Sequence, residues 1–439
     1  MSSSPAASDA RHDSALPGLE ALLAPAVERY LDLHQHPELS GAEQRTAARF
    51  ADWLEADGFR VLRGVGGHGV AAELRNGEGP AVLLRAELDA LPVAERTGVP
   101  YASTATATGP DGQQVPVMHA CGHDAHLACA AGAASWLAAR PDRWRGTLLV
   151  VGQPAEETLS GARALLDDGL YERITPPDDV LAQHTAPFPA GMVAHADGPV
   201  MAGSTTLRVV FEGDGGHVAT PHLAANPVQV AARTVVRLSD EVRPADPTDW
   251  LVVVPAGLHT GNGGHAGNVI ASRAVLDVAV RAFDEAVLDR AAAAVTEVAR
   301  AEAAGAPRPT EVSVHVLNRS GVTVCDPDTG AAVRAAHRAL FGPQRVTRWP
   351  GSAATEDFPL LTGAGAHLHG RPDIRGAYWM LGSTGPAQWA KTPGAGAAEK
   401  LGRLPANHSP RFLPSVRLTL STGMAALTAA ALARLGTPR

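Results

Sequence analysis

Hydrophobic and polar positions in the first part of the chain follow two different periods. Helical spacing of apolar residues predicts helices over 21–34, 41–57 and 126–139, whereas short apolar runs predict strands over 70–75 and 81–85. Helices that alternate with strands from about Leu19 to Pro199 favour a parallel or mixed sheet covered by helices. Ligands collect at the carboxyl ends of strands in such sheets. The residues expected at that edge are Asp89, Cys121, Glu156 and His184.

The middle of the chain has a different order of elements. The pattern predicts, in sequence, strand 205–213, helix 226–242, strands 250–257 and 274–283, helix 285–303 and strand 311–317. This βαββαβ order is that of a ferredoxin-like domain, a small sheet with two helices on one face. The pattern therefore predicts a self-contained domain over residues 202–318, inserted into the first.

The remainder of the chain returns to the first domain, with a helix over 327–341, a strand over 376–381 and a closing helix over 415–435. We expect a discontinuous α/β main domain with a mixed sheet, made of residues 19–201 and 319–439. Residues 1–18 are polar, lack the apolar core of a secretion signal and are expected to form a disordered tail. The connection over 386–407 is long, which is typical of functional or disordered loops.

Composition narrows the class of protein. The 439 residues are 45% hydrophobic and 19% charged, which suffices for a large core and more than one domain. The formal net charge is −8 without a basic stripe, so we expect no nucleic-acid partner. We see no apolar run of membrane-spanning length and expect no membrane partner. Three cysteines do not make a disulfide framework, and a reducing, cytoplasmic location fits.

The segment Met118-His119-Ala120-Cys121-Gly122-His123-Asp124-Ala125-His126 carries the most chemistry. It holds a thiol, imidazoles and a carboxylate in one short turn. Nitrogen and sulfur donors together suit borderline cations such as zinc, and the Cys-x-His spacing lets two donors converge from a loop. The segment is therefore a candidate metal site.

A pair of carboxylates, Glu156 and Glu157, follows the apolar run 145–152 at the predicted end of a strand. Adjacent side chains on extended backbone point in opposite directions. One carboxylate could then bind a cation while its neighbour faces the reacting space as a base. Two further histidines stand next to turns, His184 at the end of the run 179–184 and His408 in 405–410, and each is a candidate ligand beside the alternative of a surface or capping residue.

Several motifs in order resemble the amidohydrolase branch of the M20 metallopeptidases, which includes aminoacylases, hippurate hydrolases and plant auxin-conjugate hydrolases. The resemblance spans about Leu31 to Pro414. It is carried by His34-Gln35-His36-Pro37-Glu38-Leu39-Ser40, Arg85-Ala86-Glu87-Leu88-Asp89-Ala90-Leu91-Pro92, the Cys121 segment, Glu156-Glu157, Gly215-Gly216-His217 with Pro221-His222, Gly267-Asn268-Val269-Ile270 and Glu356-Asp357-Phe358.

The resemblance implies a centre of two divalent metal ions, with zinc favoured by the thiolate and manganese, cobalt or nickel as alternatives. The implied ligands are Cys121, His123, Glu157, His184 and His408. Glu156 would be the general acid/base, taking a proton from water and returning it to the departing amine. Asp89 and Asp124 would orient imidazoles.

The inserted domain would, by the same resemblance, be a satellite, lid or dimerisation domain, so a homodimer is an expected state. His217 would contact a substrate oxygen, and Asn268 and His222 would be further substrate contacts, His222 alternatively orienting its loop. Arg281 is the preferred partner for a substrate carboxylate, with Arg273 as the alternative.

The chain departs from the family pattern at several positions, among them Glu87, where the family usually has Asp, and Ala271, where Pro is common. None of these changes removes an implied ligand. The implied reaction is hydrolysis of N-acyl amino acids to a carboxylic acid and a free amino acid. A dipeptidase or carboxypeptidase with the same metal centre is the alternative, and a non-catalytic metal-binding protein is a third interpretation.

Overall fold

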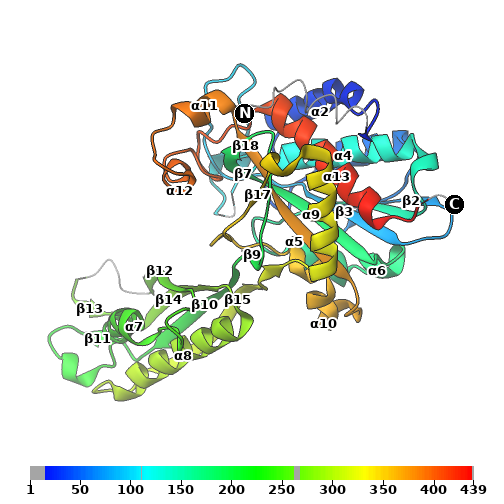
Figure 1. Ribbon diagram of the computed structural model, residues 1–439. Helices are drawn as coiled ribbons and strands as arrows, with labels where there is room; N and C mark the ends of the chain where they lie inside the picture. Colours follow the sequence, from blue (N-terminus) through cyan, green and yellow to red (C-terminus); the bar gives the residue numbers. More distant parts are fainter. Residues whose placement is uncertain (1–14, 110, 262–266, 438–439) are drawn as a thin grey trace. The chain divides into compact units, whose positions relative to one another are not determined.

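The computed structural model describes residues 15–437 except 110 and 262–266 (Figure 1). Within the described residues the chain divides into two compact units. The larger unit comprises Met1–Val200, Val324–Pro350 and Asp357–Arg439, and the smaller comprises Met201–Thr323 and Gly351–Glu356. Residues 1–14 of the expected disordered tail lie outside the described residues. In the described part of that tail, Leu16 is buried and the carbonyl of Pro17 accepts a hydrogen bond from Trp136 Nε1 at 3.1 Å.

The larger unit is built on a mixed sheet with the strand order β1-β2-β6-β3-β7-β18-β8-β17. Its strands are β1 (Arg60–Val65), β2 (Gly69–Asn76), β3 (Ala81–Glu87), β6 (Gly146–Gln153), β7 (Asp179–Pro189), β8 (Val193–His195), β17 (Val346–Arg348) and β18 (Arg375–Thr384). Neighbours among β6, β3, β7 and β18 are parallel, whereas the β1–β2, β2–β6 and β18–β8 pairs are antiparallel. The predicted α/β class with a mixed sheet is confirmed.

The helices of the larger unit are α2 (Leu23–Gln35), α3 (Gln44–Ala56), α4 (His123–Ala138), α5 (Gly161–Asp167), α6 (Leu170–Arg173), α9 (Pro327–Phe341), α10 (Ala366–His369), α11 (Pro386–Lys391), α12 (Ala397–Leu401) and α13 (Val416–Arg434). Short 3₁₀ turns cover Glu20–Leu22, Pro141–Arg143, Pro343–Arg345, Phe358–Leu361 and Gly363–Gly365, and a small hairpin joins β4 (Thr106–Thr108) to β5 (Gln114–Pro116). The connection 386–407, expected to be a loop, thus contains α11 and α12.

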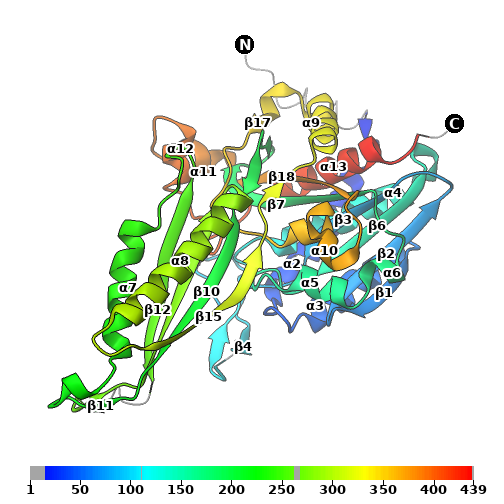
Figure 2. The ribbon, with the colours of Figure 1, turned by 90° about the horizontal axis from the view of Figure 1, so that it is seen from below.

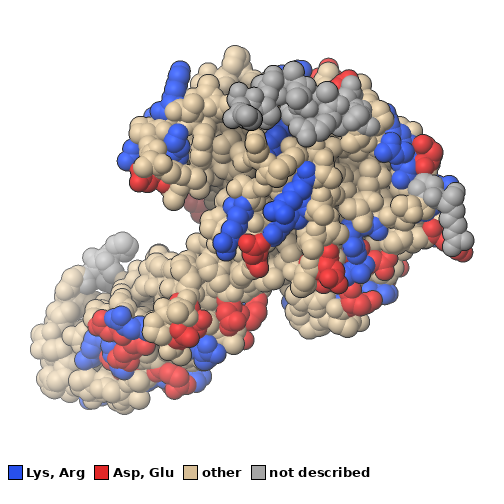
Figure 3. Space-filling model, viewed as in Figure 1, with Lys and Arg blue, Asp and Glu red and all other residues tan. Residues whose placement is uncertain are grey.

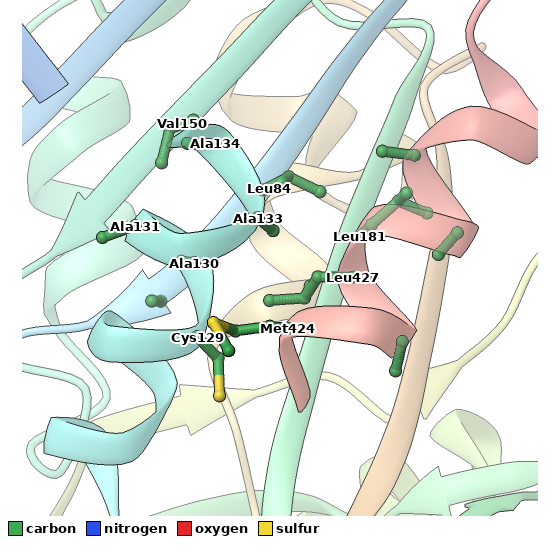
Figure 4. Packing of buried hydrophobic residues seen from close by; sticks show 14 of the residues in the cluster. Leu84, Cys129, Ala130, Ala131, Ala133, Ala134, Val150, Leu181, Met424 and Leu427 are labelled. Carbon is green, nitrogen blue, oxygen red and sulfur yellow. The ribbon is translucent and has the colours of Figure 1, made fainter. Parts of the chain in front are cut away.

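Helices α4 and α13 pack against each other and against β3 and β7. Small residues allow this close approach, because a Cβ on Gly132 would lie 2.2 Å from Met424 Sδ, and one on Gly423 would lie 2.5 Å from Cys129 Sγ. Figure 4 shows Met424 of α13 beside Cys129 of α4, with Leu84, Leu181 and Leu427 in the same cluster. This packing fixes the start of α4, which carries His123.

The closing helix α13 corrects one expectation from the sequence. With 19 residues and a mean hydropathy of 1.4, it is long and apolar enough to cross a membrane by composition alone. However, 61% of that stretch is buried within the protein, and α13 packs on α2, α4 and α9 (Figure 1). A helix that packs between other helices in a protein core can be as long and as apolar as a membrane-spanning helix, because both environments favour apolar residues.

The smaller unit has its elements in the βαββαβ order that the sequence pattern predicts. They are β10 (Gly203–Glu212), α7 (Pro227–Glu241), β12 (Leu251–Gly261), β14 (Arg273–Ala282), α8 (Glu285–Gly305) and β15 (Glu311–Ser320). The antiparallel sheet has the order β12-β14-β10-β15, and α7 and α8 lie along it (Figure 2). Strand β14 alternates buried residues with residues that are mostly half-buried, and its buried side chains form a separate core with both helices.

Further short elements of the smaller unit are the 3₁₀ turn Pro221–Leu223 and the paired strands β11 (Gly216–His217) and β13 (Val269–Ile270). Strands β9 (Pro199–Met201) and β16 (Thr323–Val324) span the chain positions where one unit passes into the other. On the face that Figure 3 draws, acidic and basic side chains are interspersed over each unit, as the modest net charge suggests.

The register of the parallel strands brings the candidate residues to one edge of the large sheet. Strand β3 ends at Glu87 opposite Gln153, the last residue of β6. The pair Arg85–Ala182 aligns β3 with β7, so His184, two positions further along β7, lies level with Glu87. The carboxyl ends of β3 and β6 therefore open beside His184, where the segments that follow them deliver Asp89 and the carboxylate pair.

Candidate metal centre

Cys121 and His123 are placed by the sharp turn that opens α4. Gly122 caps the helix with φ of 88°, and a Cβ there would lie 2.5 Å from Thr185 Oγ1. Only glycine accepts both the left-handed backbone and the close approach. Helix α4 begins at His123 and not at 126 as predicted, since the left-handed Gly122 makes the following residues helical at once. Both Cys121 and His123 are buried.

The rings of His123 and His184 are oriented by backbone carbonyls. Nδ1 of His123 lies 2.8 Å from the carbonyl of Asp89, and Nδ1 of His184 lies 2.8 Å from that of Thr185. Because a carbonyl only accepts, each Nδ1 carries the hydrogen, and in a neutral ring Nε2 presents a lone pair. Nε2 of His184 lies 3.4 Å from Cys121 Sγ. Both rings therefore offer the nitrogen that a metal ion needs.

Glu157 connects the two sides of the cluster. Its Oε1 lies 3.9 Å from His123 Nε2, and its Oε2 lies 3.2 Å from His408 Nε2. Among the described residues, buried His123 Nε2 and Glu157 Oε1 have no hydrogen-bond partner. Donor atoms of Cys121, His123 and Glu157 all lie within 4.8 Å of one another. Orphaned donor atoms that face each other across so small a space fit a bound cation.

His408 enters the cluster from the loop after α12. Its φ is 69°, its backbone N–H donates to the carbonyl of Ala120 at 2.8 Å, and its side chain is 54% exposed. A left-handed non-glycine residue is strained, and such strain concentrates at functional sites. The structure thus brings Cys121, His123, Glu157, His184 and His408 to one place from four separate stretches of the chain.

The charges of the cluster also suit a cation. Burial alone would lower the pKa of His123, but hydrogen bonding to Asp89 and the negative charge of Glu87, Asp89 and Glu157 raise it to about 10. Burial, with Glu157 and Glu156 nearby, raises the pKa of the Cys121 thiol well above its usual range. Burial of the Cys121 thiol and the negative charge around both groups therefore hold protons on them. A divalent cation would take the place of those protons and leave a thiolate and a neutral imidazole.

The carboxylate pair differs from the expectation in its backbone. Glu156 and Glu157 lie in a turn closed by the Leu159 N–H to Glu156 carbonyl bond of 2.7 Å, next to Ala155 with φ of 48°. Both carboxylates therefore approach the same nitrogen, with Glu156 Oε2 3.7 Å from His123 Nε2. The alternation of extended backbone does not apply in a turn, so the two side chains do not point in opposite directions.

Two carboxylates hold that turn in place. Asp89 Oδ2 accepts hydrogen bonds from the Glu157 N–H at 2.9 Å and from Ser40 Oγ at 2.7 Å. Glu43 Oε1 accepts from the Ala155 N–H at 2.8 Å. Asp89 also lies 3.3 Å from His123 Nδ1, in keeping with its expected role of orienting an imidazole. Asp124, which was also expected to orient an imidazole, has its Oδ2 2.7 Å from Nδ1 of His34. His34 is not one of the expected metal ligands.

Glu87 and His126 belong to the same cluster, although sequence reasoning gave neither a role. Donor atoms of Glu87, His123, His126 and His184 lie within 4.8 Å of one another. Nε2 of His126 accepts from the Thr185 N–H at 2.9 Å, so its Nδ1 carries the hydrogen and donates to Glu87 Oε2 at 2.7 Å. Both ring nitrogens are engaged, so His126 links Glu87 of β3 to Thr185 of β7 and has no lone pair left to offer.

Glu87 is held in place by a buried network of hydrogen bonds. Arg85 donates to Glu87, to Gln153 Oε1 at 2.9 Å and to Asp357 Oδ1 at 3.1 Å. Gln153 Nε2 also donates to Asp357 Oδ1 at 2.7 Å. The motifs around residues 85 and 357 were visible in the sequence, but their partnership was not, because the positions lie far apart in the chain.

The expected substrate contacts lie in the smaller unit. His217 on β11 stands opposite Val269 of β13, and the Val218 N–H donates to the Asn268 carbonyl at 3.2 Å, so His217 and Asn268 lie on the same exposed two-stranded ladder. His222 is exposed in the following 3₁₀ turn, where its carbonyl accepts a hydrogen bond from Arg308 at 2.9 Å.

The two candidate arginines lie at opposite ends of β14. Arg281 donates to the Ala353 carbonyl at 2.6 Å, and Arg273 lies 3.7 Å from Glu212 at the surface. Strand geometry separates the two by about 26 Å. Arg273 is the first residue of β14, shortly after β13, whereas Arg281 is near the other end of the strand. Arg281 is therefore not part of the cluster formed by His217 and Asn268.

Comparison with known proteins places this geometry in a family. The profile described as peptidase family M20/M25/M40 matches residues 83–393. The N-acetyl-L-cysteine deacetylase of Bacillus subtilis (strain 168) is 33% identical over 363 residues, covering 81% of this chain and 80% of that protein. The hippurate hydrolase of Campylobacter jejuni is 36% identical over 255 residues, 57% of this chain and 63% of that protein.

Solved structures agree with the sequence relatives. The crystal structure of the YXEP protein of Bacillus subtilis, described as a dinuclear metal binding peptidase from the M20 family, has a TM-score of 0.70 and 25% identity, covering 94% of this chain and 99% of that one. The resemblance found in the motifs is thereby confirmed. The chain belongs to peptidase family M20/M25/M40 and is a hydrolase that acts on amide bonds.

Proposed function

We propose that this protein is a metal-dependent amidohydrolase that cleaves N-acyl amino acids to a carboxylic acid and a free amino acid. The observation that carries the proposal is the set of orphaned, buried donor atoms on His123 and Glu157, enclosed by Cys121, His184 and His408, with Glu156 beside them. Two divalent ions, with zinc favoured by the thiolate, would supply Lewis acidity and lower the pKa of water there.

The residues of the chain would divide the remaining work. Glu156, whose carboxylate lies at the edge of the ligand cluster, would accept a proton from the attacking water and return it to the amine nitrogen as the C–N bond breaks. His217 would donate a hydrogen bond to the oxygen that becomes negative, and Asn268 and His222 would contact the substrate. Arg281 would bind the substrate carboxylate only after releasing the Ala353 carbonyl, and not in the same complex as His217 and Asn268 of its own chain, because about 26 Å of β14 lies between them.

The charge of the site supports an acylated amine over a dipeptide. A dipeptide carries an ammonium group that needs a free carboxylate in the pocket. Glu87 is engaged by Arg85 and His126, and Asp89 by Ser40, His123 and the Glu157 N–H. The Glu87 carboxylate is therefore not available for an ammonium, and the Asp89 oxygen without a hydrogen bond, Oδ1, lies against the His123 ring. The deacetylase and the hippurate hydrolase that the chain resembles act, by their names, on acylated substrates.

The test is a set of matched substrates, assayed with purified protein and zinc, manganese, cobalt or nickel. N-acetyl-L-alanine and glycyl-L-alanine differ by one group, a methyl against an aminomethyl, so they isolate the ammonium. Benzoyl and longer acyl derivatives extend the comparison. We expect faster turnover of the acylated member of each pair and reversible loss of activity with a chelator. Faster turnover of the dipeptide would identify a dipeptidase or carboxypeptidase instead. That alternative is supported by the 32% identity to the thermostable carboxypeptidase 2 of Saccharolobus solfataricus.

We also propose that the smaller unit is a satellite domain through which two copies of the chain form a homodimer. Its edge strands β12 and β15 expose large apolar side chains, including Val254 and Leu258 on the first and Val316 and Leu317 on the second. Exposed apolar edge strands are open to pairing with another chain. Light scattering after size exclusion would test this.

The free state of Cys121, Cys129 and Cys325 supports a reducing location such as the cytoplasm.

A further inference from the structure

Asn407 stands at the point where the ligand-bearing segments meet. It precedes His408, and its Nδ2 lies 3.1 Å from the Cys121 carbonyl, 3.1 Å from the Thr185 carbonyl and 3.7 Å from Cys121 Sγ. Cys121 is itself an expected ligand, and Thr185 follows His184 in β7. One amide group therefore touches the loop before α4, the strand that carries His184 and the loop that carries His408.

The orientation of this amide follows from its neighbours. Carbonyl oxygens only accept hydrogen bonds, so the nitrogen of Asn407, and not its oxygen, faces Cys121 and Thr185. The two hydrogens of the amide match the two carbonyls, and the sulfur lies just beyond them on the same side.

The segments that Asn407 joins have few other connections at this point. The Cys121 and Thr185 loops also meet through the Thr185 hydroxyl, which donates to the Cys121 carbonyl at 2.8 Å. The His408 loop is attached by its own N–H to Ala120, and its backbone is left-handed at His408. A strained residue keeps its conformation only when the surrounding contacts hold it.

We propose that Asn407 is a positioning residue, which sets the spacing of Cys121, His184 and His408 in the metal-bound protein. The inference rests on the proposed metal centre and adds to it a residue that is not a ligand. Outer partners of metal ligands typically change metal affinity by about 10- to 100-fold when they are removed. We expect a loss of that size here.

Two substitutions separate hydrogen-bond donation from packing. Asn407→Ala removes the donors and some volume. Asn407→Asp keeps the shape but turns a carboxylate toward two carbonyls and a thiolate. If Asn407 acts as a donor, the aspartate variant binds metal more weakly than the alanine variant. If Asn407 only fills space, the order is reversed.

Asn76 offers a matched control in the same unit. Its Nδ2 also donates to two carbonyls, those of Pro141 and Trp144, each at 2.6 Å. Asn76 pairs with Gly146, the first residue of β6, whereas the cluster lies beyond Gln153 at the other end of that strand. Asn76→Ala and Asn76→Asp therefore remove the same kind of bond at the opposite edge of the sheet.

The measurement is the affinity of metal-free full-length protein for Co²⁺. Titration calorimetry gives the affinity, and the near-ultraviolet thiolate-to-cobalt absorption band reports the Cys121–cobalt bond. Both Asn407 variants should bind Co²⁺ about 10- to 100-fold more weakly, with a shifted or weakened absorption band, and Asn407→Asp should be the worse. Both Asn76 variants should keep the wild-type affinity and band while losing thermal stability.

An unchanged affinity and band in both Asn407 variants would overturn the inference, and so would a milder effect of aspartate than of alanine. Wild-type protein that binds Co²⁺ but hydrolyses no N-acyl amino acid would refute the proposed function and leave the role of Asn407 standing. Wild-type protein that binds no Co²⁺ would overturn both.

Discussion

Glu87 Oε2 lies 2.7 Å from Nδ1 of His126, and both side chains are fully buried beneath the metal-ligand cluster. Burial would raise the pKa of Glu87, but the charge of Arg85 and the hydrogen bond from His126 outweigh it and hold the pKa well below its usual range. The carboxylate is therefore ionised. The Thr185 N–H donates to His126 Nε2, so Glu87 and His126 together hold the Thr185 backbone in place. The carbonyl of Thr185 in turn accepts the hydrogen bond from His184 Nδ1.

His126→Ala should destabilise the fold without removing a metal ligand. The substitution leaves the Thr185 N–H without its acceptor and Glu87 without one of its partners, at a cost of about 2–4 kcal/mol in the free energy of unfolding. Urea denaturation of the variant gives that value. Metal analysis at saturating metal should still find the wild-type number of ions per chain. A loss of one ion would identify His126 as a ligand, contrary to its two engaged nitrogens.

The control for that experiment is His367→Ala on α10, where the side chain is exposed. Surface substitutions of this kind change the free energy of unfolding by less than about 0.5 kcal/mol. A similar loss in both variants would show that the effect at His126 does not come from its buried hydrogen bonds.

Glu156→Gln should lower kcat by about 10²- to 10⁴-fold, because the amide cannot accept the proton of the attacking water. Metal content and thermal stability should stay at the wild-type level, since Glu156 is not one of the proposed ligands. The assay uses the best acylated substrate from the matched pairs. Glu172→Gln, an exposed carboxylate of the same unit, is the control and should leave kcat unchanged. Near-normal turnover by Glu156→Gln would reject Glu156 as the base.

Cys121→Ala and Cys129→Ala form a matched pair of buried cysteines that lie within and outside the cluster. Cys121→Ala should weaken metal binding by more than about 100-fold, since even the partners of ligands change affinity about 10- to 100-fold. Cys129→Ala should retain its metal and lose some stability through the cavity it leaves beside Gly423. Elemental analysis after dialysis measures both. Equal metal retention in the two variants would show that the thiol of Cys121 is not a ligand.

His34 should make part of the stability of the fold depend on pH. Burial would lower its pKa, but hydrogen bonds to Asp124 at 2.7 Å and to Glu95 at 3.2 Å raise it to about 9, from about 6.5 in an unfolded chain. A raised pKa means that this contribution is complete below about pH 6.5 and is lost as the pH rises through about 9. The corresponding free energy is about 3 kcal/mol.

Urea denaturation of His34→Gln across pH 6 to 10 tests this expectation. The variant should be less stable than the wild type at pH 6, and the difference should shrink toward pH 10. His36→Gln changes a half-exposed ring next to the same helix and should reproduce the wild-type pH profile. A difference between His34→Gln and the wild type that stays constant over this range would contradict the assignment.

Local signals in the sequence determined several elements closely. Helix α9 runs from Pro327 to Phe341 as predicted, because the Asp326 side chain caps its first turn and Gly342 with φ of 77° ends it. The starts of α7 and α8 are set in the same way by Asn226 and Asp284. Such signals need only neighbouring residues, so a single sequence contains them.

Other elements depended on contacts that no local pattern records. Strand β1 was not predicted, since its half-exposed residues 60–65 become a strand only by pairing with β2. Helices α11 and α12 were expected to be loop, because each is too short to show a hydrophobic period. The turn of Glu156 and Glu157 was expected to be extended, and the hydrogen bonds from Glu43 and Asp89 decide otherwise.

The candidate site shows the same division. The sequence alone supplied the residue types and the family, and with them Cys121, His123, Glu157, His184 and His408 as expected ligands. Only the tertiary structure decided which nitrogen of each ring faces the cluster, why His126 is engaged and what Asn407 touches. The physical reason is that hydrogen-bond partners assign these roles. Apart from the Thr185 carbonyl next to His184, those partners lie 34 to 286 positions away in the chain.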